Sequence, residues 1–471
     1  YITIYRSIKL LKDTLIYTNK IRFLQMEQSS ILTTIFSLFV RQCAQLQAHN
    51  CQIESKFLMS LRTFQGLPDL AKEHMALVTG LIEEALQWDM KEETLIPIQL
   101  SPVNQYDDYG FMTVPEYEAA DWKLLAKIQA LEIKCTNLNK KTTEKPFSER
   151  WNNLGELTPS SELKSLLRCG IPAVHRQRVW RWIISHRLKQ TRSAGHYHNL
   201  LKKCENAEHP ASQQIELDLH RTLPNNRHFM SPTSQLIPKL RRVLLAFSWQ
   251  NPTIGYCQGL NRLVAIALLI LEEEEEAFWC LVHITNNLMP YDYYSNTLIG
   301  SQVDQRVFKD ILSEKLPRLT AHLDQLQIDL SLVTFNWFLV VFVDNLISDL
   351  LLQVWDAFLY EGAKVIFRYA LAIFKYNEEA ILKIQDNLEF YQYLRFFTKT
   401  ICDGRKLMSI AFSDMNPFPM KLLQNRRRVH RLKVEAELRE LEQLKAQYVK
   451  EQAEQAAIQP DGPTSEEEEE I

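Results

Sequence analysis

Ile215-Glu216-Leu217-Asp218-Leu219-His220-Arg221 is the stretch of this chain in which apolar, acidic and basic residues alternate at helical spacing. Residues three or four positions apart share one face of an α-helix, so Ile215 and Leu219 are expected on a buried stripe. By the same spacing, Asp218 and Arg221 are expected to pair. Pro224 disfavours helical backbone just before it, which places Arg221 close to the helix C-terminus. A side chain there can reach outward, although a surface salt bridge is the simpler interpretation.

A second motif lies upstream, in Arg176-Gln177-Arg178-Val179-Trp180, with the pattern R-x-x-x-W. Pro172 is expected at the start of the helix that carries it, because proline is favoured in the first helical turn. Arg176 lies one turn before Trp180, so its guanidinium can either stack on the indole or bridge to a neighbouring helix. We therefore expect both residues to be structural.

A third motif lies downstream, in Tyr256-Cys257-Gln258, with the pattern Y-x-Q. Glycines 255 and 259 flank it, and the apolar run 260–271 predicts a buried helix directly afterwards. Gln258 is then near a helix N-terminus, where unpaired N–H groups and the helix dipole favour a nearby phosphate. Taken alone, this glutamine could equally be a helix cap.

In this order, R-x-x-x-W, I-x-x-D-x-x-R and Y-x-Q resemble the three fingerprint motifs of TBC-domain Rab GTPase-activating proteins. Each pattern is short and unspecific, whereas three in the right order are specific. The resemblance implies an all-α, multi-helix TBC domain in which Arg221 and Gln258 are catalytic and enter the active site of a GTP-bound Rab. The resemblance also implies supporting residues. Asp218 is expected to anchor the arginine, and Tyr256 is expected to support the loop that carries Gln258. The other supporting residues are Arg176, Trp180 and Ile215.

An upstream segment narrows the resemblance to one subfamily. Residues 106–116, which read YDDYGFMTVPE, look like the segment that precedes the TBC domain in Armus-type proteins. The resemblance to the TBC family covers residues 163 to about 418, and this segment extends it towards Tyr106. It makes a Rab of the late endosomal route the first partner to test. Without the resemblance, the segment reads as a solvated connector whose aromatic residues pack singly on the domain.

The resemblance implies a protein that activates another enzyme rather than an enzyme in its own right. No cofactor or metal site is expected in the chain, because the partner Rab carries GTP and magnesium. The absence of a G-x-x-x-x-G-K-[ST] phosphate loop argues against independent hydrolysis. The alternative is a catalytically weak Rab-binding adaptor or tether built on the same domain. A membrane-surface protein organised by the basic residues 426–428 has less support.

The amino-acid composition limits the possible fold and the possible classes of function. With 471 residues, 46% of them hydrophobic, the chain can bury a substantial core, and only 12 glycines with widespread helical spacing favour an all-α fold. A formal charge of -3 argues against a general nucleic-acid binder. Eight cysteines without a C-x-x-C pair predict reduced thiols in a cytoplasmic protein, open to recruitment to endosomal membranes. No transmembrane segment or signal peptide is evident, so any membrane association is expected to be peripheral.

The chain divides into five expected parts, separated by proline-containing and polar stretches. A chain beginning with tyrosine is also expected to be a fragment of a longer protein. Residues 1–95 form a helical segment, either the end of a coiled coil or a lone amphipathic helix. The other parts are a linker with one helix over 96–162, the TBC domain over 163–420, an amphipathic helix over 421–458 that docks or self-associates, and a disordered acidic tail over 459–471.

Overall fold

The computed structural model describes residues 30–65, 72–87, 106–112, 127–128, 130–135, 147, 149–207, 209–231 and 233–458. Within these ranges the regular structure is helical, with two isolated antiparallel bridges and no strand. The prediction of an all-α fold is therefore confirmed. The expected acidic tail lies outside the described residues. Among the helices described, none has the length and apolar composition needed to cross a bilayer.

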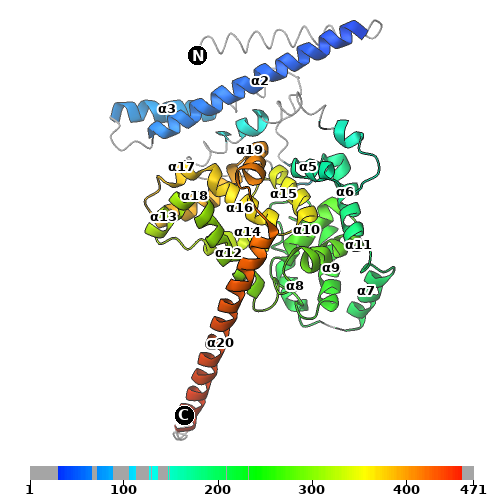
Figure 1. The fold of residues 1–471 in the computed structure, drawn as a ribbon. Coiled ribbons are helices and arrows are strands. Elements are labelled where there is room, and N and C mark those ends of the chain that lie inside the picture. The colour runs from blue at the N-terminus through cyan, green and yellow to red at the C-terminus, as the bar shows by residue number, and fades with distance from the viewer. Residues whose placement is uncertain are drawn as a thin grey trace, which may run out of the picture.

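Two N-terminal helices, α2 (Ser30–Gln65) and α3 (Lys72–Gln87), lie along one side of the main helical body (Figure 1). They pack on each other and on a short helical stretch around residue 128, and their small shared core consists of Leu58, Leu61, Val78, Ile82 and Ile128. Ser55 Oγ of α2 also donates a hydrogen bond to Glu132 at 3.3 Å. In this region α2 packs against α3 of the same chain, and the end of a coiled coil stays a prediction.

The main body is a succession of helices that pack on one another at short range (Figure 1). In chain order these are α5 (Ser161–Arg168), α6 (Ala173–Arg187), α7 (His196–Asn206), α8 (Ser212–Leu219), α9 (Leu236–Gln250), α10 (Leu260–Leu271), α11 (Glu274–His283), η3 (Ile284–Leu288), α12 (Ile299–Lys315), α13 (Pro317–Gln325), α14 (Ser331–Leu339), α15 (Ser348–Glu361), α16 (Lys364–Tyr376), α17 (Glu378–Ile381), α18 (Asn387–Phe397), η4 (Thr398–Thr400), α19 (Gly404–Ser409), η5 (Ile410–Asp414) and α20 (Met420–Ile458).

A continuous hydrophobic core joins these helices, with α10 near its centre. The apolar run 260–271 forms α10 as predicted, and nearly every residue of this helix is buried between α9 and α11. The core reaches past both expected boundaries of the 163–420 domain. Trp151 has no exposed surface and Val434 is 1% exposed. Packing thus begins earlier and ends later than the sequence pattern indicates, while the division into independently folding parts stays a prediction.

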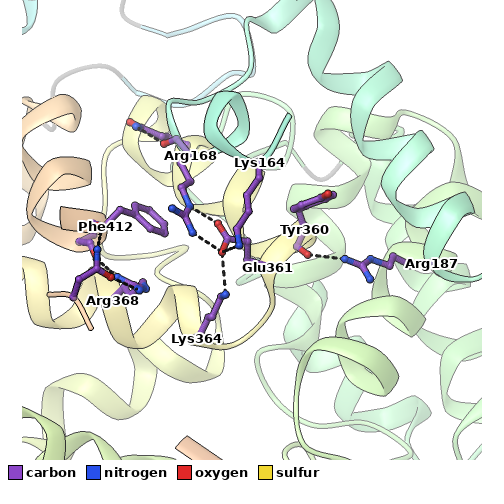
Figure 2. A network of polar contacts seen from close by, with 11 residues as sticks. Lys164, Arg168, Arg187, Tyr360, Glu361, Lys364, Arg368 and Phe412 are labelled. Atoms are coloured by element: carbon purple, nitrogen blue, oxygen red, sulfur yellow. Dashed lines mark hydrogen bonds and ion pairs between the residues drawn. The ribbon is translucent and has the colours of Figure 1, made fainter. Parts of the chain in front are cut away.

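Glu361, the last residue of α15, ties three helices together (Figure 2). Its side chain is only 3% exposed, and its carboxylate accepts from Arg168 Nη2 of α5 at 2.8 Å and pairs with Lys364 of α16 at 3.1 Å. Burial by itself would raise the pKa of this carboxyl group, but the bonds and charges of the two cations outweigh burial and lower the pKa to about 2. The ionised Glu361 therefore joins the start of the domain to its C-terminal half.

The first half of α20 docks on α12 and the second half extends away from the body (Figure 1). Arg427 Nε donates to Asp304 at 2.6 Å, and Arg431 Nη1 donates to Asp292 at 2.6 Å. Beyond the buried Val434, four large hydrophobic side chains are more than half exposed: Leu441, Leu444, Tyr448 and Val449. Docking, one of the two alternatives for this helix, is found for its first half. Self-association through the second half stays a prediction.

Candidate functional site around Arg221 and Gln258

Arg221 lies in the turn directly after α8, which ends at Leu219. The expected pair with Asp218 is present, since Arg221 Nε donates to Asp218 Oδ1 at 2.7 Å and Nη2 donates to the same oxygen. The two side chains differ sharply in exposure, at 51% for Arg221 and 0% for Asp218. The chain can leave the helix here because the Thr222 hydroxyl donates to the Asp218 carbonyl at 2.7 Å. The arginine is thus anchored at one edge and open to solvent at the other.

The buried stripe predicted for this helix is also present. Ile215 and Leu219 have no exposed surface and belong to the main core. Because they fix the orientation of α8, Asp218 is directed inward and Arg221 is left at the surface. Ile215 therefore acts through the packing of α8.

Tyr256 connects the second motif to the third. Its hydroxyl donates to Asp218 Oδ2 at 2.5 Å, while Arg221 binds the other oxygen of the same carboxylate. Burial raises the pKa of Tyr256, and the hydrogen bond and charge of Asp218 raise it further. The hydroxyl therefore stays protonated and remains a donor near neutral pH. One buried carboxylate thus holds Arg221 and also the loop that leads to Gln258.

Gln258 is exposed and lies two residues before α10, close to the helix N-terminus as predicted. Within the described part of the chain, its carboxamide has no hydrogen-bond partner, so it does not cap the helix. The following residue, Gly259, has a φ of +110°, and a Cβ at that position would lie 3.0 Å from Val340 Cγ1. The main chain at the end of the third motif is therefore closely packed, while the glutamine side chain stays free.

Asn261 links the turns that follow Arg221 and Gln258, and the three motifs did not indicate it. Its Oδ1 accepts from the Gly259 amide at 3.0 Å, and its Nδ2 donates to Thr222 Oγ1 at 2.7 Å. It has no exposed surface. Asn261 therefore ties the turn after Arg221 to the turn before α10. The available signal was an asparagine near the start of a largely apolar helix, since a buried amide needs polar partners.

Arg176 and Trp180 of the first motif are both buried and both bind Asp356 of α15, while their structural role stays a prediction. Arg176 Nε donates to Asp356 Oδ1 at 3.1 Å, and the indole of Trp180 donates to the same oxygen at 2.7 Å. Of the two alternatives for the guanidinium, the bridge to a neighbouring helix is the one found. Burial disfavours the charged form of Arg176, but Asp356 and Tyr109 outweigh it and raise the pKa above its ordinary value. In the part of the chain that the structure describes, the hydrogen bonds of Arg176 and Trp180 go to Asp356, Tyr109 and Ile171, and none goes to Arg221.

Comparison with known proteins agrees with this geometry. Residues 173–382 match the family model of the Rab-GTPase-TBC domain. TBC1 domain family member 2A of Mus musculus is 63% identical over 429 residues, which cover 91% of this chain and 46% of that protein. TBC1 domain family member 2B of Homo sapiens is 51% identical over 422 residues, which cover 86% of this chain and 43% of that protein.

A solved structure supports the same assignment. The Chlamydomonas flagellar RabGAP TBC domain is 28% identical, with a TM-score of 0.55, over 65% of this chain and 98% of that domain. The chain spans about half the length of the curated relatives that it matches, 46% and 43% for the two named above. Residues 173–382, which include Arg221 and Gln258, therefore match a Rab-GTPase-TBC domain.

Proposed function

We propose that this chain is a GTPase-activating protein for a Rab-family GTPase and that it supplies Arg221 and Gln258 to the Rab active site in trans. One observation carries the proposal: the buried carboxylate of Asp218 holds both the half-exposed Arg221 and, through Tyr256, the loop of Gln258. An arginine and a glutamine are thereby presented from one rigid junction. The Rab-GTPase-TBC domain at residues 173–382 makes a Rab the expected partner.

The proposed role of Arg221 follows from the charge that develops during phosphoryl transfer. In the transition state, negative charge accumulates on the γ-phosphoryl oxygens and on the bridging oxygen to the β-phosphate. A guanidinium that arrives already oriented stabilises this charge without reorganising. Asp218 provides that orientation, because it binds the Nε edge of the guanidinium and leaves the side chain half exposed.

The proposed role of Gln258 is to position the attacking water. A carboxamide can accept a hydrogen bond from the water through its oxygen and donate one to a phosphate through its nitrogen. In GTPases of this kind, a glutamine orients the water for in-line attack. The lack of an intramolecular partner for Gln258 within the described residues leaves both groups available to a Rab.

The partner carries the rest of the chemistry in this proposal. GTP and magnesium belong to the Rab, so the chain needs no cofactor of its own and acts as an activator rather than as an independent enzyme. The Armus-type resemblance of residues 106–116 directs the first test to a Rab of the late endosomal route. We propose that the chain acts from the cytoplasm, with peripheral recruitment to endosomal membranes.

The decisive experiment is single-turnover GTP hydrolysis across a panel of purified, GTP-loaded Rabs, with the full chain added in excess. We expect strong acceleration for one Rab or a few related ones. The adaptor alternative predicts a different result, in which a GTP-bound Rab binds the chain but hydrolyses GTP at its intrinsic rate. A panel with no acceleration at all would overturn the proposal.

A further inference from the structure

Residues 106–112, here called the 106–112 hairpin, form a small turn that determines its own shape. The amide of Asp107 donates to the Phe111 carbonyl at 2.9 Å, and the amide of Gly110 donates to the Asp107 carbonyl at 3.0 Å. Asp107 Oδ1 accepts from the amides of Tyr109 at 2.9 Å and Phe111 at 2.8 Å. An aspartate that binds the backbone two and four residues ahead stabilises a turn locally. The hairpin is therefore an ordered unit.

One side of the hairpin holds the loop 222–230, which follows Arg221. Phe111 and Asn226 form an antiparallel bridge, and the Arg227 amide donates to the Gly110 carbonyl at 2.7 Å. Asn226 Nδ2 donates to the Tyr109 carbonyl at 3.0 Å, and Asn226 is only 1% exposed. The centre of the loop thus donates one main-chain and one side-chain hydrogen bond to carbonyl groups of the hairpin, a few residues after the arginine.

The other side of the hairpin is fixed to the first motif. The hydroxyl of Tyr109 accepts a hydrogen bond from Arg176 Nη1 at 3.0 Å, and its ring centroid lies 5.7 Å from the guanidinium carbon. Arg176 is itself held by the buried Asp356. The hairpin therefore connects the buried pair of Arg176 and Asp356 to the loop that directly follows Arg221.

The hairpin and the loop approach each other closely at Gly110. Gly110 has a φ of +77°, and a Cβ there would lie 2.5 Å from Cδ2 of the His228 ring and 3.2 Å from Asn226 Oδ1. An alanine at this position must displace the exposed His228 ring and shift the buried Asn226 side chain by a few tenths of an ångström, at a φ that L side chains rarely adopt. Gly195 provides a matched reference, since its φ is +74° and nothing lies within 4 Å of its added Cβ.

We propose that the 106–112 hairpin is a positioning element for Arg221, because it fixes the loop 222–230 and thereby the direction in which the arginine leaves its turn. The inference rests on the proposed function. Holding a reacting group in the productive geometry before the partner arrives removes an entropy cost from the transition state. Loss of the hairpin contact should consequently lower the rate at saturation more than it weakens Rab binding.

The test compares Gly110→Ala with Gly195→Ala in the full chain. Both variants place an alanine at a similar positive φ, +77° and +74°, but only the methyl group of Gly110→Ala meets atoms of the loop. With the best Rab of the panel, we expect Gly110→Ala to lower the saturating single-turnover rate by about 10- to 100-fold. The chain concentration at half saturation should stay within about threefold of wild type. Gly195→Ala should keep the wild-type rate.

Two further measurements separate positioning from general damage. Hydrogen exchange at the Arg227 amide, which reports docking without any Rab, should be faster in Gly110→Ala only. Adding His228→Ala removes the ring that the new methyl group meets, so the double variant should recover most of the rate. Unchanged exchange in Gly110→Ala would show that the hairpin does not hold the loop. If Gly110→Ala exchanges faster but accelerates GTP hydrolysis as much as Gly195→Ala does, the positioning role is overturned. A wild-type chain that activates no Rab contradicts only the proposed function.

Discussion

Arg221 and Asp218 form an ion pair, 2.7 Å from Nε to Oδ1, in which the arginine side chain is 51% exposed and the carboxylate is fully buried. A surface pair between two mobile side chains contributes little and orients neither partner. Here the carboxylate cannot move, because Tyr256 binds its other oxygen at 2.5 Å. The pair therefore fixes the orientation of the Arg221 side chain.

Arg221→Ala should abolish most of the acceleration and leave most Rab binding intact. An arginine finger contributes about 10³ to 10⁵ to the rate in related GTPases, and that contribution arises only as transition-state charge develops. Arg221→Lys should restore little activity, because an ammonium cannot reproduce the planar contact with Asp218. Single-turnover rates and a separate affinity measurement on the same Rab would check this. Full acceleration by Arg221→Ala would show that Arg221 does not have the proposed catalytic role.

Gln258→Ala should likewise reduce the rate without affecting folding, since the side chain is exposed. If this glutamine positions the water in trans, a Rab that lacks its own switch glutamine should still respond to the wild-type chain. The response should vanish with Gln258→Ala. The Arg221→Ala/Gln258→Ala variant should be little worse than the poorer single variant, because both groups act on one transition state. A strictly multiplicative loss would argue against a joint action.

Changes in the first motif should act on stability. Trp180→Ala should lower the free energy of unfolding by about 3 to 5 kcal/mol, as expected for a large buried aromatic residue. Asp356→Ala should cost a similar amount, about 3 to 5 kcal/mol, because it leaves Arg176 buried without its carboxylate. Denaturant unfolding measures both, with Asp324→Ala, at a 60% exposed position, as the control. A Trp180→Ala protein that unfolds like wild type yet is inactive would contradict the structural role.

Acid should weaken the contact that Glu361 makes between α5, α15 and α16. The folded-state pKa of about 2 lies below the ordinary value of 4.5, so the folded state favours the ionised form. The ionised Glu361 therefore contributes on the order of 3 kcal/mol to the free energy of unfolding. This contribution is fully present above pH 4.5 and is lost as the pH falls towards 2. Glu361→Gln should therefore be less stable than wild type at pH 7, and the gap should narrow below pH 4.5. A gap that is independent of pH would show that the charge is not the source.

The sequence predicted those parts of the site that depend on local spacing. Ile215, Asp218, Leu219 and Arg221 lie within two helical turns, so periodicity alone places two of them in the core and pairs the others. Gln258 is likewise placed by the apolar helix that begins two residues later. These arrangements need no knowledge of distant residues.

The long-range partners were not predictable from spacing. Asp356 is 180 residues from Arg176, and the choice between stacking and bridging depends on that distant helix. Tyr109 is 117 residues from Asn226, so the 106–112 hairpin reads equally well as a solvated connector. Asn261 shows only that a buried amide must find partners, without saying which ones.

Gln258 and Gly259 are adjacent, but they differ in how much space the structure leaves for a side chain. Every substitution at 259 adds a side chain at a φ of +110° and 3.0 Å from Val340, whereas the side chain at 258 projects into solvent. In a saturation library scored for cellular abundance and GTPase activation separately, variants at 259 should be depleted in both scores. Variants at 258 should keep their abundance and lose only activation. Two adjacent positions would thus separate the requirement of folding, at 259, from the requirement of GTPase activation, at 258.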